Sequence, residues 1–275
     1  MKYSYKDFND KFNVYNFDLK KKYGQNFIID ENIINSIINK SNIDEDTLVL
    51  EIGPGAGSLT YKLAQVSKNV LCYEIDKTVK DILLNNLDGL NNVEVVFEDF
   101  LKSNPKDKLK KYKYKKLYVV ANLPYYITTP IITKIIEDEI CVDKIVIMVQ
   151  KEVGDRFRAQ PNTKDYNSLS VYLNYYFDIK KLLDVSRNVF IPVPNVDSIV
   201  IELTAKKNKL YLKDKKLFFK LVRDSFVQKR KTIKNNLKNY DLNIIEKVLS
   251  KYGFTLQVRA EAIPLDVFVD ISNNL

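Results

Sequence analysis

The chain has no histidine, no tryptophan and only two cysteines, Cys72 and Cys141, among its 275 residues. Without histidine it cannot build a Ser-His or Cys-His nucleophile, and it lacks the side chain that most often acts as a general base near neutral pH. Two cysteines and no histidine do not make a zinc site, so no metal is expected. Each cysteine lies in an apolar run, which predicts that both are small core residues. The absence of these groups argues against most hydrolase mechanisms.

Long apolar runs are missing as well. No stretch is long and apolar enough to cross a bilayer, and the N-terminal MKYSYKDFND lacks the hydrophobic core of a signal peptide. We therefore expect a cytoplasmic protein with no membrane partner. Hydrophobic residues make up 45% of the chain, enough for a sizeable core. A large domain followed by a small one, in a monomer, is the simplest expectation.

The net charge of +9 is distributed unevenly. Up to Thr204 there are 28 basic and 28 acidic residues, whereas Ala205 to Leu275 contains 16 basic and 7 acidic residues. A segment with this excess of positive charge suits a polyanionic partner. The sequence thus predicts a neutral domain over residues 1–204 and a basic domain over residues 205–275.

Short β-rich runs alternate with helix-sized segments from Thr47 onward. This alternation is typical of an α/β fold with a parallel, doubly wound sheet. The runs are LVLEI (48–52), VLCYEI (70–75), VEVVF (93–97), LYVVA (117–121) and KIVIMV (144–149). The basic segment KDKLKKYKYKK (106–116) is predicted to be a solvated connection before the fourth strand.

Two further β-like runs, SLSVYLNYYF (168–177) and VDSIVIEL (196–203), follow without a long helix between them. They predict an antiparallel hairpin at the edge of the sheet. Two prolines in FIPVP, between these runs, require an extended path. Apolar residues then recur at helical spacing over Leu217–Leu237 and Leu242–Tyr252, so the small second domain is predicted to be all-helical.

A glycine-rich loop follows the first β-rich run. EIGPGAGSLT has Gly53, Gly55 and Gly57 at alternate positions, where the backbone can turn sharply and approach a ligand. By itself this could be an ordinary strand-to-helix turn, and its spacing is not that of the dinucleotide fingerprint. Glu74 ends the second run, where a carboxylate can bond both ribose hydroxyls. Asp99 follows the third run, where its carboxylate could accept a hydrogen bond from an adenine amino group. The order of a glycine loop, an acid after the second run and an aspartate after the third resembles that of S-adenosylmethionine-dependent methyltransferases.

The fourth run ends in NLPY, which is suited to amine chemistry. An adenine amine is a poor nucleophile because its lone pair is delocalised into the ring. If Asn122 Oδ1 and the Leu123 carbonyl each accept one amine hydrogen, the nitrogen can become tetrahedral and aim its lone pair at a methyl group. Pro124 makes the turn rigid, and Tyr125 offers a face for an extruded base. Phe190 in FIPVPNVDS could clamp the base from the other side, or be a core residue.

The arrangement does not by itself fix the substrate, because the amines of adenine, cytosine and glutamine all fit it. The whole chain, however, resembles the small-subunit ribosomal RNA adenine N6,N6-dimethyltransferases of the dimethyladenosine transferase type. The motifs that carry this resemblance, beside EIGPGAGSLT, are KKYGQNFIID (21–30), NLPYYITTP (122–130), QKEVGDR (150–156), FIPVPNVDS (190–198) and FVQKRKTIKNNL (226–237).

The resemblance implies a Rossmann-like class I methyltransferase domain, a small helical C-terminal domain and S-adenosylmethionine as the cofactor. It implies that the cofactor pocket is formed by Gln25, Asn26, Ile28, Gly53, Glu74, Asp99 and Asn122. Departures from the family pattern are Gly154 for Ala or Val, Arg187 for a frequent Pro, and Tyr23 for Leu or Phe. None of the three is a proposed catalytic group.

The erythromycin-resistance methyltransferases, which act on the large-subunit RNA, are similar too. Leu123, the YYITTP continuation and an expected QKRKTIKNNL helix favour the small-subunit enzymes. The resemblance implies as target two adjacent adenines in the 3′-terminal hairpin loop of 16S ribosomal RNA, each methylated twice during assembly of a 30S-type particle.

RNA contact is expected from basic side chains that neutralise phosphates, with binding that weakens steeply with salt. The candidate residues are Arg156, Arg158, Lys229, Arg230, Lys231 and Lys234. Two functions of other classes stay open. One is a ribosome-assembly binding factor in which methylation is dispensable, and the other is a nicotinamide-dependent oxidoreductase on a similar fold.

Overall fold

The computed structural model describes residues 26–275. These residues form two compact units. One contains the chain up to Lys151 together with Lys180–Thr204, and the other contains Glu152–Ile179 and Ala205–Leu275. Residues 152–179, which the sequence analysis assigned to the first domain, thus share a compact unit with the basic C-terminal segment. No helix in the described part of the chain is both long and apolar enough to cross a membrane.

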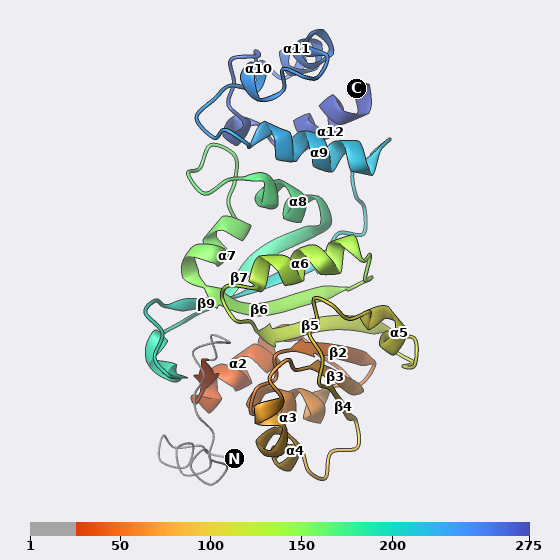
Figure 1. Cartoon of the computed structure of the whole chain (residues 1–275), viewed down its shortest axis with the longest axis vertical. Coiled ribbons are helices and arrows are strands. Elements are labelled where there is room, and N and C mark those ends of the chain that lie inside the picture. The colour runs from red at the N-terminus through yellow and green to blue at the C-terminus, as the bar shows by residue number, and fades with distance from the viewer. Residues whose placement is uncertain (1–25) are drawn as a thin grey trace. The chain divides into compact units, whose positions relative to one another are not determined.

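A seven-stranded sheet is the centre of the first unit, and its strand order is β4-β3-β2-β5-β6-β9-β7 (Figure 1). The strands are β2 (Thr47–Ile52), β3 (Asn69–Tyr73), β4 (Val93–Val96), β5 (Lys116–Asn122), β6 (Lys144–Gln150), β7 (Phe177–Val185) and β9 (Ser198–Ala205). Neighbours from β4 to β6 are parallel, and β9 is antiparallel to β6. The predicted doubly wound sheet and its first five strands are confirmed.

The position of β2 determines where a ligand can bind. All six residues of β2 are buried, as expected for a strand covered on both faces in a parallel sheet. The chain runs outward from β2 to β3 and β4, and then returns to β5 on the other side of β2. Strand order therefore reverses between β2 and β5, and the carboxyl ends of strands at such a point leave a crevice.

Helices connect the strands of this unit and cover the sheet. They are α2 (Glu31–Ser41), α3 (Ser58–Val66), α4 (Lys80–Asn86), α5 (Pro105–Leu109) and α6 (Thr128–Glu137), with short 3₁₀ turns η2 (Lys77–Val79) and η3 (Arg187–Val189). The helices α2 and α3 bury Ile34, Ile37 and Leu63 in one cluster with Val49 and Cys72 of the sheet. The helix α5 occupies part of the basic segment that was predicted to be only a connection.

A two-stranded ribbon adds a second, smaller sheet. The strand β1 (Phe27–Ile28) pairs antiparallel with β8 (Phe190–Ile191), so FIPVP begins in an extended path as predicted. This pairing joins the beginning of the described chain to the segment before β9.

The predicted strand at residues 168–177 is wrong, because most of it forms the helix α8 (Ser168–Tyr176). The Asn167 side chain accepts backbone N–H groups of Leu169 and Ser170, and the Ser170 hydroxyl accepts the N–H of Asn167. This reciprocal capping starts a helix although valine and tyrosine favour strands. The edge of the sheet consists of β9 and β7 instead.

The second unit contains the remaining helices: α7 (Lys151–Phe157), whose first residue still belongs to the first unit, α8, α9 (Lys215–Ser225), α10 (Ile233–Asn236), α11 (Leu242–Lys251), α12 (Leu265–Asn274) and the 3₁₀ turn η4 (Ala260–Ala262). The helix predicted over Leu217–Leu237 is interrupted between α9 and α10. The Asn236 side chain donates to the Ser225 carbonyl at 2.7 Å and so satisfies the end of α9. The helix α12 was not predicted.

The two cysteines differ. Cys72 is buried in β3, as predicted, whereas Cys141 is exposed, so its assignment to the core is wrong. Cys141 lies in the loop between α6 and β6, and its sulfur donates to the Glu139 carbonyl at 3.8 Å. Its neighbours Ile140 and Val142 are buried, so the apolar run does reach the core, but the Cys141 side chain itself faces solvent.

A buried ion pair joins β6 to β9. Glu202 is 2% exposed, and its carboxylate lies 3.3 Å from Lys144 Nζ and 2.9 Å from Lys180 Nζ. Lys144 also donates to the Ser41 carbonyl at 2.8 Å. Removing one charge from such a group leaves the other buried without compensation.

Replacement of this carboxylate should therefore be costly. We expect Glu202→Gln to lower the free energy of unfolding by about 3 kcal/mol, because Lys144 stays buried and charged. Urea unfolding measures this change. The control Asp107→Asn removes a carboxylate from an ion pair whose side chains are 65% and 75% exposed, and should have a much smaller effect. Equal losses for the two variants would contradict the prediction.

Candidate functional site

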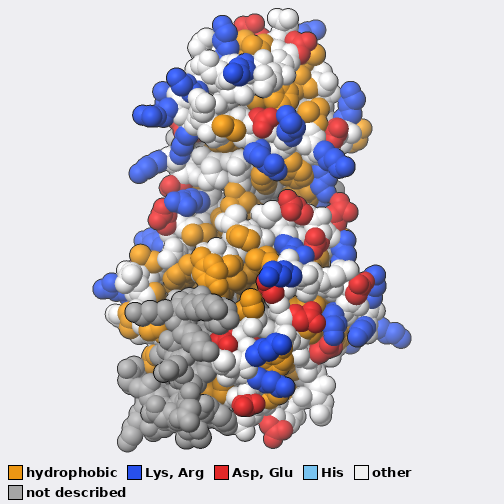
Figure 2. All heavy atoms as spheres, in the orientation of Figure 1, with side chains coloured by type: hydrophobic (Ala, Val, Ile, Leu, Met, Phe, Trp, Pro, Cys, Tyr) orange, Lys and Arg blue, Asp and Glu red, His pale blue; other side chains and the backbone are white. Residues whose placement is uncertain are grey.

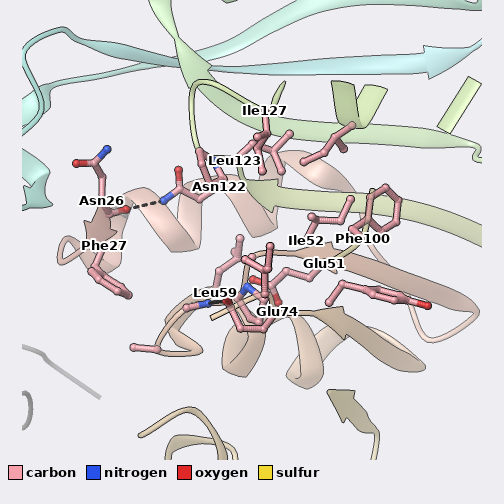
Figure 3. Close-up of a pocket in the computed structure, with 18 of the residues that line it drawn as sticks. Asn26, Phe27, Glu51, Ile52, Leu59, Glu74, Phe100, Asn122, Leu123 and Ile127 are labelled. Atoms are coloured by element: carbon pink, nitrogen blue, oxygen red, sulfur yellow. Dashed lines mark hydrogen bonds between the residues drawn. The ribbon is translucent and has the colours of Figure 1, made fainter. Parts of the chain in front are cut away.

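A cavity of about 330 Å³ opens at the carboxyl ends of β2, β3, β4 and β5, where the strand order reverses (Figure 3). All of its lining belongs to the first unit. Ten of the residues predicted to bind cofactor or act in catalysis line it: Asn26, Ile28, Gly53, Gly55, Glu74, Asp99, Asn122, Leu123, Pro124 and Tyr125. The fold thus gathers segments that are far apart in the sequence around one space.

The glycine loop forms one wall because its backbone adopts conformations that other residues avoid. Gly55 has a φ of +58°, and a Cβ there would lie 2.9 Å from the ring of Phe27. Gly57 has a φ of +85°, but a Cβ there would meet Leu83 of α4 at 2.8 Å. The absence of a side chain at Gly55 therefore leaves room for Phe27 in the cavity wall. Gly57 does not line the cavity, and its lack of a side chain lets α4 pack closely against the start of α3.

Glu74 is buried at the end of β3, 4% exposed, beside the loop. Its Oε2 accepts the N–H of Gly55 at 3.0 Å, and its Oε1 accepts the N–H of Asp76 at 2.8 Å. Burial raises the pKa of Glu74, against the lowering effect of these two N–H groups. A carboxylate has about four lone-pair sites, so Glu74 can still accept hydrogen bonds from a ligand's hydroxyl groups.

Asp99 follows β4 and also lines the cavity. Its Oδ1 accepts the N–H of Leu101 at 2.9 Å, which fixes the direction of the side chain. An acidic oxygen that lines the cavity here fits an amino group of a ligand. Glu74 and Asp99 together suit a ligand with neighbouring hydroxyls at one place and an amino-bearing ring at another.

Glu51, the first residue of the EIGPGAGSLT motif, also lines the cavity, and no role was predicted for it. It is 1% exposed and accepts a hydrogen bond from Cys72 Sγ at 3.6 Å. Burial away from water raises the pKa of Glu51 to about 8. The carboxyl group is therefore protonated over much of the range in which most glutamates are ionised.

Asn122 is the last residue of β5, and its amide has a defined orientation. Its Nδ2 donates to the backbone carbonyl of Asn26 at 2.9 Å, and Figure 3 shows Oδ1 at the other end of the amide. Because the amide nitrogen is used in this bond, Oδ1 is the end that can accept hydrogens from a ligand. The orientation thus agrees with the role predicted for Asn122 from the NLPY motif.

Some predicted site residues do not reach the cavity. Phe190 is 1% exposed, is paired with Ile28 in the β1–β8 ribbon, and is packed in the core cluster. It does not line the cavity, so the structure favours the core role that the sequence left open. Gln25 lies outside the described residues.

Aromatic residues of the cavity wall were missed. Phe27, Tyr73 and Phe100 line the cavity, and the rings of Tyr73 and Phe100 meet edge to face at 5.5 Å. Such rings offer flat apolar surfaces to a planar ligand. Their positions next to Asn26, Glu74 and Asp99 in the sequence were the available signal, because residues beside a ligand-binding side chain at a strand end commonly share its cavity.

The predicted RNA-binding residues all belong to the second unit: Arg156, Arg158, Lys229, Arg230, Lys231 and Lys234. Lysine and arginine side chains are spread over this unit on the face shown in Figure 2. Arg156 and Arg158 pair with Glu152 and Asp155, neighbours within one helical turn. Within residues 26–275, no carboxylate forms an ion pair with the other four, whose side chains are exposed.

The densest basic residues lie on a turn rather than on the helix that was expected. Lys229, Arg230 and Lys231 fall between α9 and α10. The turn is fixed by a bond from the Ile233 N–H to the Val258 carbonyl at 2.8 Å, and Lys229 Nζ donates to the Lys164 carbonyl. A fixed, exposed turn with three cations suits contact with phosphate groups.

Comparison with known proteins agrees with this geometry. Residues 16–275 match the family described as ribosomal RNA adenine dimethylase. Ribosomal RNA small subunit methyltransferase A from Macrococcus caseolyticus is 44% identical over 271 residues, which cover 95% of this chain and 91% of that protein. The protein of the same name from Staphylococcus aureus is 44% identical over 266 residues, covering 94% and 90%.

Two solved structures are similar over nearly their whole length. A dimethyladenosine transferase from Plasmodium falciparum superimposes with a TM-score of 0.75 and 26% identity, covering 89% of this chain and 95% of that one. The 23S rRNA methyltransferase ErmE superimposes with a TM-score of 0.70 and 26% identity, covering 91% and 99%. A dimethyladenosine transferase and a 23S rRNA methyltransferase thus share this fold.

The raised pKa of Glu51 predicts how stability depends on pH. As the pH rises from about 4.5 to about 8, the unfolded chain loses this proton while the folded protein keeps it, so folding becomes less favourable. Above about pH 8 both states are ionised and this contribution levels off. Glu51→Gln removes the titration, and we expect its unfolding free energy, measured in urea, to fall less than that of the wild type over this range. Glu45→Gln, at an exposed site, should follow the wild type; a Glu51→Gln curve parallel to the wild type would refute the assignment.

The glycine loop supplies a second prediction. Gly55→Ala should weaken binding of S-adenosylmethionine, the cofactor expected from the sequence, about tenfold or more, because the new Cβ strains the backbone and displaces Phe27. Calorimetric titration measures the affinity. Gly89→Ala is the matched control, since Gly89 also has a positive φ, of +80°, but no atom lies within 4 Å of its Cβ position. Unchanged affinity in Gly55→Ala would show that the cofactor does not use this wall.

Proposed function

The chain belongs to the ribosomal RNA adenine dimethylase family, and on this premise we propose that it dimethylates the N6 amines of two adjacent adenines in 16S ribosomal RNA. The family and the relatives establish the coarser activity: the chain is an S-adenosylmethionine-dependent ribosomal RNA methyltransferase, similar to enzymes named for the small subunit. The proposal adds the site in the RNA, the 3′-terminal hairpin loop, and the number of methyl groups. It also adds the stage, during assembly of a 30S-type particle.

The observation that carries the proposal is the oriented amide of Asn122. With Nδ2 held by the Asn26 carbonyl, Oδ1 can accept one hydrogen of the target amine, and the Leu123 carbonyl can accept the other. Two acceptors draw the amine nitrogen towards tetrahedral geometry and localise its lone pair. The chemistry needs no histidine, because the N6 proton becomes acidic once nitrogen has formed its new bond and can leave to water.

The cofactor fits the cavity by the properties of its wall. Glu74 and Asp99 would hold the ribose hydroxyls and the adenine amino group, and the wall at Gly55 has no room for a side chain. Gly53, Ile28 and Asn26 complete the proposed cofactor site beside Asn122, with Gln25 a prediction outside the described residues. When bound, S-adenosylmethionine supplies an electrophilic methyl group.

The residues after Asn122 would present the adenine. Pro124 is part of a tight turn, because its carbonyl accepts the N–H of Ile127 at 3.1 Å. Tyr125 lines the cavity and offers a ring on which an extruded base can stack. A base held in this way has a fixed distance and angle to the methyl donor, which lowers the entropic part of the barrier.

RNA affinity is proposed to come from the basic residues of the second unit, and specificity from the shape of the RNA and its unpaired loop bases. Arg230, Lys231 and Lys234 are the strongest candidates, since they are exposed and no described carboxylate neutralises them. The proposal includes a cytoplasmic monomer acting on an incomplete small subunit.

One alternative has a specific observation behind it. ErmE, whose name gives 23S ribosomal RNA as its substrate, has the same fold over 91% of this chain. The relatives at 44% identity are named for the small subunit, however, and this difference in identity favours the small-subunit assignment.

The proposal is tested by methyl transfer from labelled S-adenosylmethionine to unmethylated small ribosomal subunits and, separately, to large-subunit precursors. We expect N6,N6-dimethyladenosine in the small subunit only, at two adjacent positions identified by mass. Asn122→Ala should lower kcat about 100-fold or more, because an acceptor needed in the transition state is lost.

Other outcomes would each reassign the protein. Label in the large subunit alone would move it to the ErmE-like branch. No transfer by the wild type, with tight binding to small subunits, would make it an assembly factor. Asn92→Ala, which removes an amide that bonds the Ala64 carbonyl away from the cavity, is the control and should retain activity if the protein folds.

A further inference from the structure

The hydroxyl of Tyr125 is bonded to the last residue of the FIPVPNVDS motif, for which no role was predicted. It lies 2.9 Å from Ser198 Oγ, 73 positions later in the chain. Tyr125 belongs to the loop between β5 and α6, whereas Ser198 is the first residue of β9. The bond thus connects the loop that carries the proposed base-stacking ring to the antiparallel strand beside β6.

Ser198 occupies a fixed position. It is 1% exposed, is paired with Gln150 in the ladder between β6 and β9, and follows Asp197, whose carbonyl accepts the N–H of Lys151 at 3.1 Å. The Asp197 carboxylate also accepts the backbone N–H of Arg187 at 3.0 Å. The backbone that carries the Ser198 hydroxyl is therefore held by the sheet and by the bonds of Asp197.

The tight turn at Pro124 holds the backbone of Tyr125 but does not by itself fix the side chain. Its ring is joined to a short loop, and rotation about the Cα–Cβ bond would change the plane that a base meets. The hydrogen bond to Ser198 fixes the hydroxyl end of the ring, so rotation about the Cα–Cβ bond, which would move that end, is restrained. A ring held in this way is preorganised for stacking, because no conformational entropy of the side chain has to be lost when the base binds.

We propose that Ser198 is a positioning residue that fixes the position of the Tyr125 ring through their hydroxyl–hydroxyl bond and thereby aligns the target adenine for methylation. The proposal rests on the proposed function, since it requires an adenine stacked on Tyr125. Ser198 does not line the cavity and has no role in holding the cofactor. Loss of the Ser198 hydroxyl should therefore lower kcat through poorer alignment of the target adenine, and should leave cofactor binding unchanged.

The test compares the wild type with Ser198→Ala, Tyr125→Phe and the double variant on unmethylated small subunits. Each single variant removes the same bond from one end, so each should lower kcat about tenfold. The double variant should be no worse than the singles, because the bond is already absent in each of them. Calorimetry should give an unchanged affinity for S-adenosylmethionine in all four proteins.

A purely structural role is separated by two further measurements. Thermal unfolding reports any loss of stability, and Ser67→Ala, which removes another buried hydroxyl of the same unit, should leave kcat unchanged. With 2-aminopurine in place of the target adenine, the fluorescence of the bound base should change in Ser198→Ala and Tyr125→Phe but not in Ser67→Ala.

Wild-type kcat in either single variant, or losses that multiply in the double variant, would overturn the inference and leave the proposed function intact. If the wild type methylates only large-subunit RNA, the proposed function fails, and the same four proteins on that RNA still decide the role of Ser198. If the wild type methylates no RNA, the proposed function fails and the inference fails with it.

Discussion

The parallel pairing of β2 with β3 on one side and with β5 on the other is the constraint on which the site depends. It brings the ends of three strands together, and with them the glycine loop, Glu74 and Asn122. Asn26, the residue before β1, adds a carbonyl that binds Nδ2 of Asn122, so that Oδ1 is the end of the amide that can accept hydrogens from a ligand. A chemical role that depends on one oxygen atom thus rests on pairing between segments far apart in the chain.

Burial of charge follows from this arrangement. Glu51 and Glu74 lie at strand ends where almost no water reaches, and burial raises the pKa of each. Glu74 compensates through two backbone N–H groups, whereas Glu51 is bonded to Cys72. In surroundings of such low polarity, each hydrogen bond between a ligand and these two acids is stronger than it would be in water. A third buried acid, Glu202, lies near the edge of the sheet, where two lysines pair with it and no ligand is involved.

The errors made from the sequence have local causes. The run at 168–177 has the composition of a strand, but the capping by Asn167 starts a helix. The basic residues at 229–231 lie on a turn because Asn236 satisfies the end of α9. In both cases a hydrogen bond to a particular neighbour outweighed the average preference of the residues.

The sequence by itself determined the doubly wound sheet, because five apolar runs spaced by helices have few other ways to bury their side chains. It also determined the chemistry, since NLPY at a strand end, a glycine loop and two acids in order limit the function strongly. Only the tertiary structure decided the orientation of Asn122, the bond between Tyr125 and Ser198, and the association of residues 152–179 with the basic segment. These depend on contacts between residues distant in the chain, and the pattern of one segment carries no information about which distant atom lies opposite it.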